Sequence, residues 1–279
     1  MSEPVVLNID GRSVSAPVGA TVLEAAQGAG IQIPHICHDP RLVPTGACRL
    51  CLVEIDGERG FQTSCTRRAM PGMVVRTNTP RIRASRKTTL ELLLSEHRVA
   101  CTTCDKDGDC LLQDYAYEYQ ASETAFPNIM LPPGQKNYAT TDAAIEYDAS
   151  KCVRCQRCVR FCSEVQMAEA ITLRGRGSDV QVTTGFDVEL NHSTCELCGG
   201  CVNTCPTAAL YDRQARGLGR AKDLVKVRST CTYCGVGCQL DLNVNPALNR
   251  VVRVTSEPGC VPNDGNLATD TWSTVDPAE

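Results

Sequence analysis

The sequence has few aromatic residues, no long apolar run and no large excess of charge of either sign. Only 4% of its 279 residues are aromatic, which argues against one large hydrophobic core and favours several small modules. No apolar run approaches the roughly 20 residues that span a bilayer, and the first residues lack the pattern of a signal peptide. A net charge of −4 gives no electrostatic basis for binding nucleic acid. We therefore expect a cytoplasmic protein without a transmembrane segment.

Cysteine, by contrast, is abundant, with 19 residues in the chain. In a secreted protein such a number indicates disulfides, whereas in a reducing compartment it indicates metal ligands. The sequence also lacks a P-loop and a complete glycine-rich dinucleotide fingerprint. We therefore expect small modules that are each stabilised by a metal centre.

Two copies of one cysteine array lie 43 residues apart. Each has the C-x2-C-x2-C-x3-C spacing of bacterial ferredoxins, in which the fourth cysteine of each run binds the other cluster. The predicted ligands of one [4Fe–4S] cluster are Cys152, Cys155, Cys158 and Cys205, and those of the second are Cys195, Cys198, Cys201 and Cys162. The alternative is a pair of zinc sites, which favour C-x2-C units separated by longer gaps.

A third set of four cysteines lies near the N-terminus, with the spacing C-x10-C-x2-C-x13-C. Its members are Cys37, Cys48, Cys51 and Cys65. A long loop, a close pair and a distant fourth ligand suit a [2Fe–2S] cluster. His35 and His38 flank the first cysteine, but four thiols already complete the site, so we expect neither histidine to bind iron.

The residues around these cysteines predict a β-grasp ferredoxin domain. An alternating strand at 5–9 is followed by an Asp-Gly turn and a partner strand at 12–16. Thr21 and Glu24 form a capping box that opens a short helix. A further strand is expected at 53–55.

One histidine and three cysteines follow in the middle of the chain: His97, Cys101, Cys104 and Cys110. Thr79-Pro80 predicts the start of a helix. Its apolar stripe ends at Leu94, and we expect His97 on the same face. Three cysteines leave one position of a four-ligand centre open, which makes the histidine a candidate ligand. Zinc held by three cysteines and one histidine is the alternative.

The order of these motifs resembles the large iron–sulfur subunit of NADH:quinone oxidoreductase. It also resembles the related subunits of NAD-linked hydrogenases, iron-only hydrogenases and NAD-dependent formate dehydrogenases. The stretch from His97 to Gln113 matches the family pattern HxxxCxxCxxxGxCxLQ, and the similarity covers about residues 1–240. The resemblance implies that His97 and its three cysteines hold a third [4Fe–4S] cluster.

The C-terminal cysteines Cys231, Cys234 and Cys238 resemble the start of the [4Fe–4S] module that precedes the molybdopterin domains of formate dehydrogenases. Strands are expected at 241–244 and 250–255. Where that family has its fourth cysteine, this sequence has Ala268, which leaves Cys260 as the predicted fourth ligand of a further [4Fe–4S] cluster. A three-iron or labile cluster, a zinc site and a remnant with inert thiols are the alternatives.

We therefore predict an α+β chain of four modules. These are a [2Fe–2S] ferredoxin domain at 1–78, a helical one-histidine/three-cysteine segment at 79–140, a two-cluster ferredoxin-like domain at 141–225, and a small β-rich [4Fe–4S] module at 226–279. The arginines Arg154, Arg157 and Arg160 beside one cluster are expected on a solvated surface, with partner docking as the alternative.

The resemblance implies an electron-transfer subunit without catalytic residues of its own. Its expected partners are a flavin- and NAD-binding subunit and a separate catalytic subunit of hydrogenase or formate dehydrogenase type, since the chain ends shortly after the fourth module. Such a complex can also be electron-bifurcating. The alternatives are a complex I-type subunit and, in another class, a non-redox zinc scaffold.

Overall fold

The computed structural model describes residues 3–127 and 144–267. They form two compact units. The first comprises residues 3–38, 44–95 and 114–127, and the second comprises residues 39–43, 96–113 and 144–267. The predicted module boundary at 140 and the position of Ala268 lie outside the described residues.

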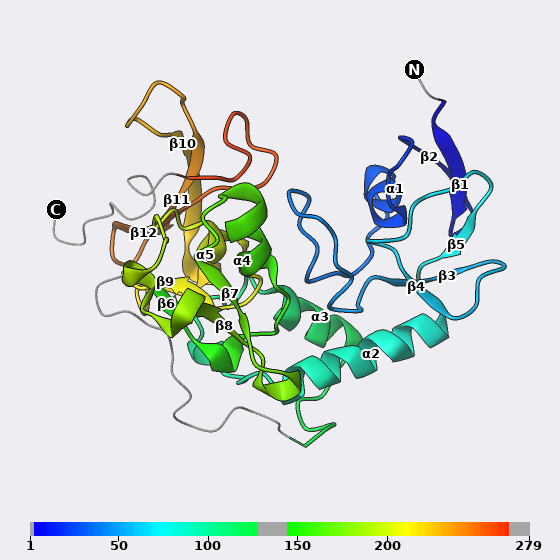
Figure 1. Cartoon of the computed structure of the whole chain (residues 1–279), viewed down its shortest axis with the longest axis horizontal. Helices are drawn as coiled ribbons and strands as arrows, with labels where there is room; N and C mark the ends of the chain where they lie inside the picture. Colours follow the sequence, from blue (N-terminus) through cyan, green and yellow to red (C-terminus); the bar gives the residue numbers. More distant parts are fainter. Residues whose placement is uncertain (1–2, 128–143, 268–279) are drawn as a thin grey trace. The chain divides into compact units, whose positions relative to one another are not determined.

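The first unit is built on a five-stranded sheet (Figure 1). Its strands are β1 (Val5–Ile9), β2 (Arg12–Ala16), β3 (Leu52–Ile55), β4 (Phe61–Thr63) and β5 (Val74–Arg76), in the order β2-β1-β5-β3-β4. β1 and β5 are parallel, and the other neighbours are antiparallel. The predicted strands at 5–9, 12–16 and 53–55 are confirmed.

Helix α1 (Val22–Gly28) starts at the predicted capping box. The Thr21 hydroxyl accepts a hydrogen bond from the Glu24 N–H at 3.2 Å, and the Glu24 carboxylate accepts one from the Thr21 N–H at 2.7 Å. Val22 and Leu23 are fully buried in the core between this helix and the sheet. Cys51 and Cys65 belong to the same core, so the fold places two predicted ligands in its interior.

Two further helices follow, α2 (Pro80–Ser95) and α3 (Leu111–Tyr119). The Thr79 hydroxyl caps α2 as predicted, because it accepts a hydrogen bond from the Ile82 N–H at 3.3 Å. The prediction that His97 lies on the apolar face of this helix is wrong. The helix ends at Ser95, and His97 lies in the turn that follows it.

The second unit contains short helices and three small sheets. Its helices are α4 (Arg157–Arg160), which continues as the π-helix Phe161–Val165, and α5 (Gly200–Thr204). Its strands are β6 (Ile145–Tyr147), β7 (Ile171–Arg174), β8 (Gln181–Thr184), β9 (Leu210–Asp212), β10 (Val225–Thr230), β11 (Gln239–Asn245) and β12 (Arg250–Thr255). The pairs β6–β9 and β7–β8 are antiparallel, and β10, β11 and β12 form an antiparallel meander. The predicted strands at 241–244 and 250–255 are confirmed as parts of β11 and β12.

None of the helices in these described ranges has the length and apolar character of a membrane-spanning segment.

Helices α4 and α5 meet where Gly200 faces the ring of Phe161, which is buried. A Cβ atom on Gly200 would overlap that ring. The residue is in an ordinary helical conformation, so steric packing and not backbone freedom requires glycine here.

Replacing Gly200 by Ala is therefore expected to destabilise the second unit by about 1–3 kcal/mol through overpacking. Thermal unfolding of the anaerobically purified chain measures this as a lower midpoint. Gly185→Ala is the matched control, because no heavy atom lies within 4 Å of a Cβ at that position. Equal midpoints for the two variants would contradict the steric argument.

Candidate iron–sulfur sites

The four N-terminal thiols lie together at the edge of the first unit's core. The Cys48 N–H donates a hydrogen bond to the Cys37 sulfur at 3.4 Å, and the sulfurs of Cys51 and Cys65 are 3.3 Å apart. All four cysteines are buried. The structure thus brings together the residues predicted to hold a [2Fe–2S] cluster.

His35 and His38, which flank Cys37 in the sequence, contact each other. The ring Nδ1 of His35 lies 2.8 Å from the carbonyl oxygen of Ile33, and the two histidine rings contact each other edge to face at 5.3 Å. That the four cysteines form the ligand set without histidine stays a prediction.

The two ferredoxin-type arrays adopt matching loop conformations. Arg154 and Leu197, the second residue after the first cysteine of each array, have φ values of 53° and 52°. In each loop the N–H of this residue donates a hydrogen bond to the sulfur of that cysteine at 3.4 Å. Gln156 and Gly199, after the second cysteine, also have positive φ, of 62° and 70°. The repeated backbone directs N–H groups toward sulfur, which stabilises thiolates.

The structure groups these eight thiols in the crossed manner that was predicted from the spacing. Cys205 lines one cavity together with Cys152, Cys155 and Cys158. Burial raises the pKa of Cys155 to about 12, and the nearby Cys205 and Cys152 contribute in the same direction. In the other group, burial and then the charge of Cys162 raise the pKa of Cys198.

The two groups are close enough to influence each other. After burial, the neighbouring thiols raise the pKa of Cys201, and they include Cys205 of the other group. Cys158 is affected in the same way by Cys201. Two centres held at these positions would be electrostatically coupled.

His97 lines a cavity with its three predicted partners, Cys101, Cys104 and Cys110. Its Nδ1 atom is buried and has no hydrogen-bond partner among the described residues. Burial lowers the pKa of His97 to about 4, so the ring is neutral at pH 7, which is the form that binds metals. An unsatisfied buried nitrogen on a residue that lines a cavity with three cysteines fits an iron ligand.

The loop between Cys104 and Cys110 is held by polar side chains that sequence analysis did not identify. Gln113, the last residue of the family pattern, accepts a hydrogen bond from the Gly108 N–H at 3.2 Å and donates one to Asp107 at 2.8 Å. Lys222 pairs with Asp107 at 2.7 Å. The glutamine of the pattern therefore closes the ligand loop.

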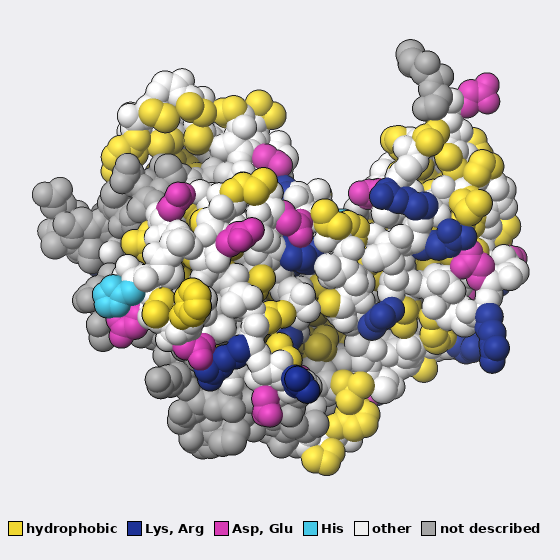
Figure 2. All heavy atoms as spheres, in the orientation of Figure 1, with side chains coloured by type: hydrophobic (Ala, Val, Ile, Leu, Met, Phe, Trp, Pro, Cys, Tyr) yellow, Lys and Arg dark blue, Asp and Glu magenta, His cyan; other side chains and the backbone are white. Residues whose placement is uncertain are grey.

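The C-terminal site is only partly assembled from its predicted residues. Cys231 and Cys238 are joined by a backbone hydrogen bond of 2.8 Å, and burial and then the charges of Cys231 and Cys234 raise the pKa of Cys238. Cys234 is exposed, and Figure 2 shows hydrophobic side chains gathered over the loop between β10 and β11, where Tyr233 and Val236 are exposed.

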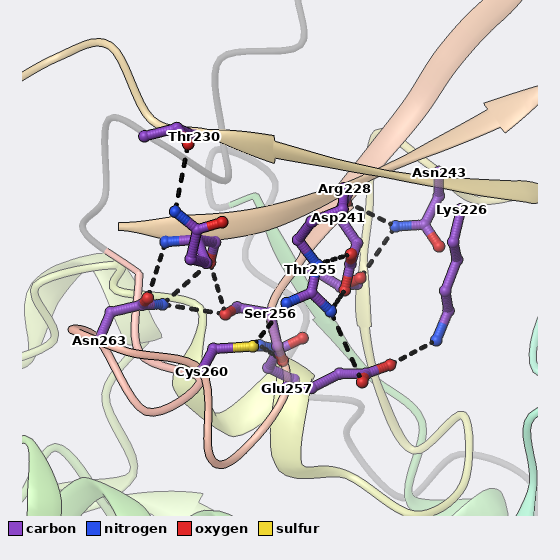
Figure 3. Close-up of polar contacts among 12 residues, drawn as sticks. Lys226, Arg228, Thr230, Asp241, Asn243, Thr255, Ser256, Glu257, Cys260 and Asn263 are labelled. Atoms are coloured by element: carbon purple, nitrogen blue, oxygen red, sulfur yellow. Dashed lines mark hydrogen bonds and ion pairs between the residues drawn. The ribbon is translucent and has the colours of Figure 1, made fainter. Parts of the chain in front are cut away.

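Cys260 makes its side-chain contact elsewhere in this module (Figure 3). Its sulfur accepts a hydrogen bond from Arg228 at 2.8 Å. Arg228 also pairs with Asp241 at 2.6 Å and with Glu257 at 3.7 Å. The structure therefore brings together three of the four predicted thiols and places the fourth in a charged network.

The expectation of a solvated surface for the arginines after Cys152 is wrong. Arg154 pairs with Glu96 and donates a hydrogen bond to the Val180 carbonyl at 2.9 Å. Arg160 is 7% exposed and donates a hydrogen bond to the Val43 carbonyl at 2.5 Å. Their charges are directed into the unit because its loops supply carboxylates and carbonyl groups at these positions.

Asp39 is a buried acidic residue that sequence analysis missed. It accepts hydrogen bonds from Arg41 at 2.9 Å, from Arg157 at 2.8 Å and from the Thr204 hydroxyl at 2.9 Å. Burial alone would raise the pKa of Asp39, but the hydrogen bonds and charges of the two arginines hold it well below its ordinary value. This residue ties α4 and α5 to the segment 39–43.

Over the described ranges, no group of three or more His, Cys, Asp or Glu side chains has the arrangement that holds a single metal ion.

Four protein-family profiles match the chain in sequence order. They describe a 2Fe-2S iron-sulfur cluster binding domain at 2–80, the NADH-ubiquinone oxidoreductase-G iron-sulfur binding region at 86–125, the ferredoxin-like domain of NADH-quinone oxidoreductase subunit 3 at 142–211, and the molybdopterin oxidoreductase Fe4S4 domain at 224–266. One [2Fe–2S] domain and several [4Fe–4S]-type domains are therefore present.

A chain of a solved NAD+-reducing [NiFe]-hydrogenase in the H2-reduced state is 32% identical, with a TM-score of 0.71. The match covers 79% of this chain and 92% of that one. This chain belongs to the family of NADH-dehydrogenase-type iron–sulfur subunits.

Other members of the family are much longer. An NADH-quinone oxidoreductase subunit of Rhizobium meliloti is 40% identical over 91% of this chain, which spans 29% of that protein. The NADP-reducing hydrogenase subunit HndD of Solidesulfovibrio fructosivorans is 35% identical over 75% of this chain, with 36% of its own length covered. The chain thus spans about a third of these curated relatives.

For an iron–sulfur subunit of this family, replacing His97 by Ala is expected to alter the spectrum of one [4Fe–4S] cluster and leave the others intact. The replacement removes the neutral imidazole and leaves three thiols. Low-temperature EPR after dithionite reduction, together with the iron content per chain, measures the effect. His192→Ala is the control because His192 is exposed. Unchanged spectra for His97→Ala would remove His97 from the ligands.

Proposed function

We propose that this chain is the electron-transfer subunit of a multi-subunit NAD(P)H-linked oxidoreductase. It would relay single electrons between a flavin- and NAD-binding subunit and a separate catalytic subunit of hydrogenase or formate dehydrogenase type. The proposal rests above all on the observation that the predicted ligands gather into separate groups in two units. The NADH-linked family to which the chain belongs supports it.

The proposed ligand sets are those predicted from the sequence. Cys37, Cys48, Cys51 and Cys65 would hold the [2Fe–2S] cluster in a β-grasp domain, which the strand order β2-β1-β5-β3-β4 supports. The crossed thiol groups support two [4Fe–4S] clusters in the ferredoxin-like domain. The orphaned nitrogen of His97 supports a third.

When bound, an iron–sulfur cluster accepts and releases one electron at a time. The chain's own residues would bury the centres, donate N–H groups to the sulfurs and balance their charge. Arg154 and Arg157, for example, act against the rise in pKa of nearby thiols, so they favour the thiolate state that iron needs. None of these residues is assigned a catalytic role.

Two relatives that belong to NAD(P)-linked hydrogenases support this placement. The structural match is a chain of an NAD+-reducing hydrogenase, and HndD is a subunit of an NADP-reducing hydrogenase. A hydrogenase-type complex is therefore the form of the proposal that we favour, and an electron-bifurcating complex is one variant of it. The matches to NADH-quinone oxidoreductase subunits keep a complex I-type role as the second candidate.

The direct test is the metal content of anaerobically purified protein. We expect a brown protein with about 14 to 18 irons per chain, an equivalent amount of acid-labile sulfide and little zinc. EPR after dithionite reduction should resolve a [2Fe–2S] signal from the [4Fe–4S] signals. A colourless, zinc-rich chain would contradict the proposal and indicate a scaffold instead. Co-purification with a flavin-containing subunit tests the assignment of partners.

Cys260 as the fourth ligand of the C-terminal site stays a prediction, supported by the three thiols gathered near the β10–β11 loop. If Cys260 is the fourth ligand, Cys260→Ser lowers the iron content by about four atoms per chain. Ser256→Ala is a control in the same module, since Ser256 lies in the adjacent hydrogen-bond network. An unchanged iron content would assign Cys260 to the contact with Arg228 that Figure 3 shows.

A further inference from the structure

We propose that Arg86 positions the loop that carries Cys51 and, through its charge, raises the reduction potential of the [2Fe–2S] centre. The inference rests on the proposed ligand set of that centre. It concerns a residue of α2 that belongs to no cysteine motif.

Arg86 is buried to an unusual degree for an arginine. It is 2% exposed and is the bulkiest of the fully buried side chains in the described ranges. Within those ranges no aspartate or glutamate forms an ion pair with it. A buried guanidinium without an opposite charge costs several kcal/mol, so its retention calls for a compensating anion nearby.

The contacts of Arg86 show where that anion would lie. Its Nε donates a hydrogen bond to the Leu50 carbonyl at 2.9 Å, and Nη2 donates one to the Leu52 carbonyl at 2.8 Å. These two residues flank Cys51 on either side. The remaining bond, from Nη1 to the Tyr119 hydroxyl at 3.1 Å, holds the other edge of the guanidinium. Arg86 therefore clamps the backbone around one predicted iron ligand.

Cys51, which these contacts flank, and the three other predicted ligands become thiolates when they bind iron. A binuclear centre with four thiolate ligands carries net negative charge, and reduction adds one more. A cation in a buried environment interacts with that charge more strongly than an exposed one, because less water screens it. Arg86 consequently favours the reduced form, which corresponds to a higher midpoint potential.

Arg49 is close in sequence to a predicted ligand, but it differs from Arg86 in its exposure to solvent. It lies next to Cys48 in the sequence, but it is exposed, so its charge is screened by solvent. The buried position of Arg86, and not proximity in sequence, makes it the effective counter-charge.

The test is a redox titration of the anaerobic protein with dithionite as the electron donor, monitored by the [2Fe–2S] EPR signal. Arg86→Gln and Arg86→Met both remove the charge and are expected to lower the midpoint potential. Arg86→Lys keeps the positive charge but loses the planar guanidinium group, so it should shift the midpoint potential less than the two neutral variants do. Arg81→Gln is the control on the same helix, because Arg81 has a side chain that is 78% exposed and pairs with Glu54 at 3.3 Å. Its midpoint should equal that of the wild type.

An unchanged midpoint in either neutral variant would overturn the inference and leave Arg86 a purely structural residue. If neither neutral variant assembles the centre while Arg86→Lys does, the requirement for a positive charge is supported. If all three fail, the clamp alone matters and the electrostatic role is rejected. A wild-type chain without any [2Fe–2S] signal would instead refute the proposed function, so the two failures are distinguishable.

Discussion

The accumulation of buried thiols is the constraint on which the rest of this structure depends. Cysteines predicted to bind iron occupy the cores of both units, where water cannot stabilise the thiolate form. Burial raises the pKa of Cys155, Cys158 and Cys201, and neighbouring thiols raise it further. Part of this rise in pKa is offset by backbone N–H groups that are directed at sulfur and by arginines that lie in the interior. With only 4% aromatic residues available for ordinary packing, we expect metal binding and folding to be coupled.

Local signals in the sequence predicted much of the fold. The capping box at Thr21, the cap at Thr79 and the strands at 5–9, 12–16 and 53–55 were found because each depends on residues close together in the chain. The crossed grouping of Cys162 and Cys205 could also be anticipated, since ligand spacing reflects the size of the cluster. The end of α2 before His97 could not, because no glycine or proline follows Ser95 to mark the end of the helix.

The side chains that sequence analysis missed act across long distances in the chain. Asp39 contacts Arg157 and Thr204, more than one hundred residues away, and no local pattern marks such a partner. Arg86 did carry a signal, because it occupies an apolar stripe at four-residue intervals with Ile82, Leu90 and Leu94, all of which are buried. A charged residue in such a stripe indicates a buried polar role.

The two ferredoxin-type loops have left-handed residues at matching positions, so the chain contains the same local structure twice. The fourth cysteine of each array lies with the other array, and this exchange makes the two arrays depend on each other. Cys205 lies with the first array and Cys162 interacts with the second, so a separated half would keep four cysteines but only three of the predicted ligands of its cluster. With the proposed ligand sets, neither half could be lost without leaving the cluster of the other half one ligand short.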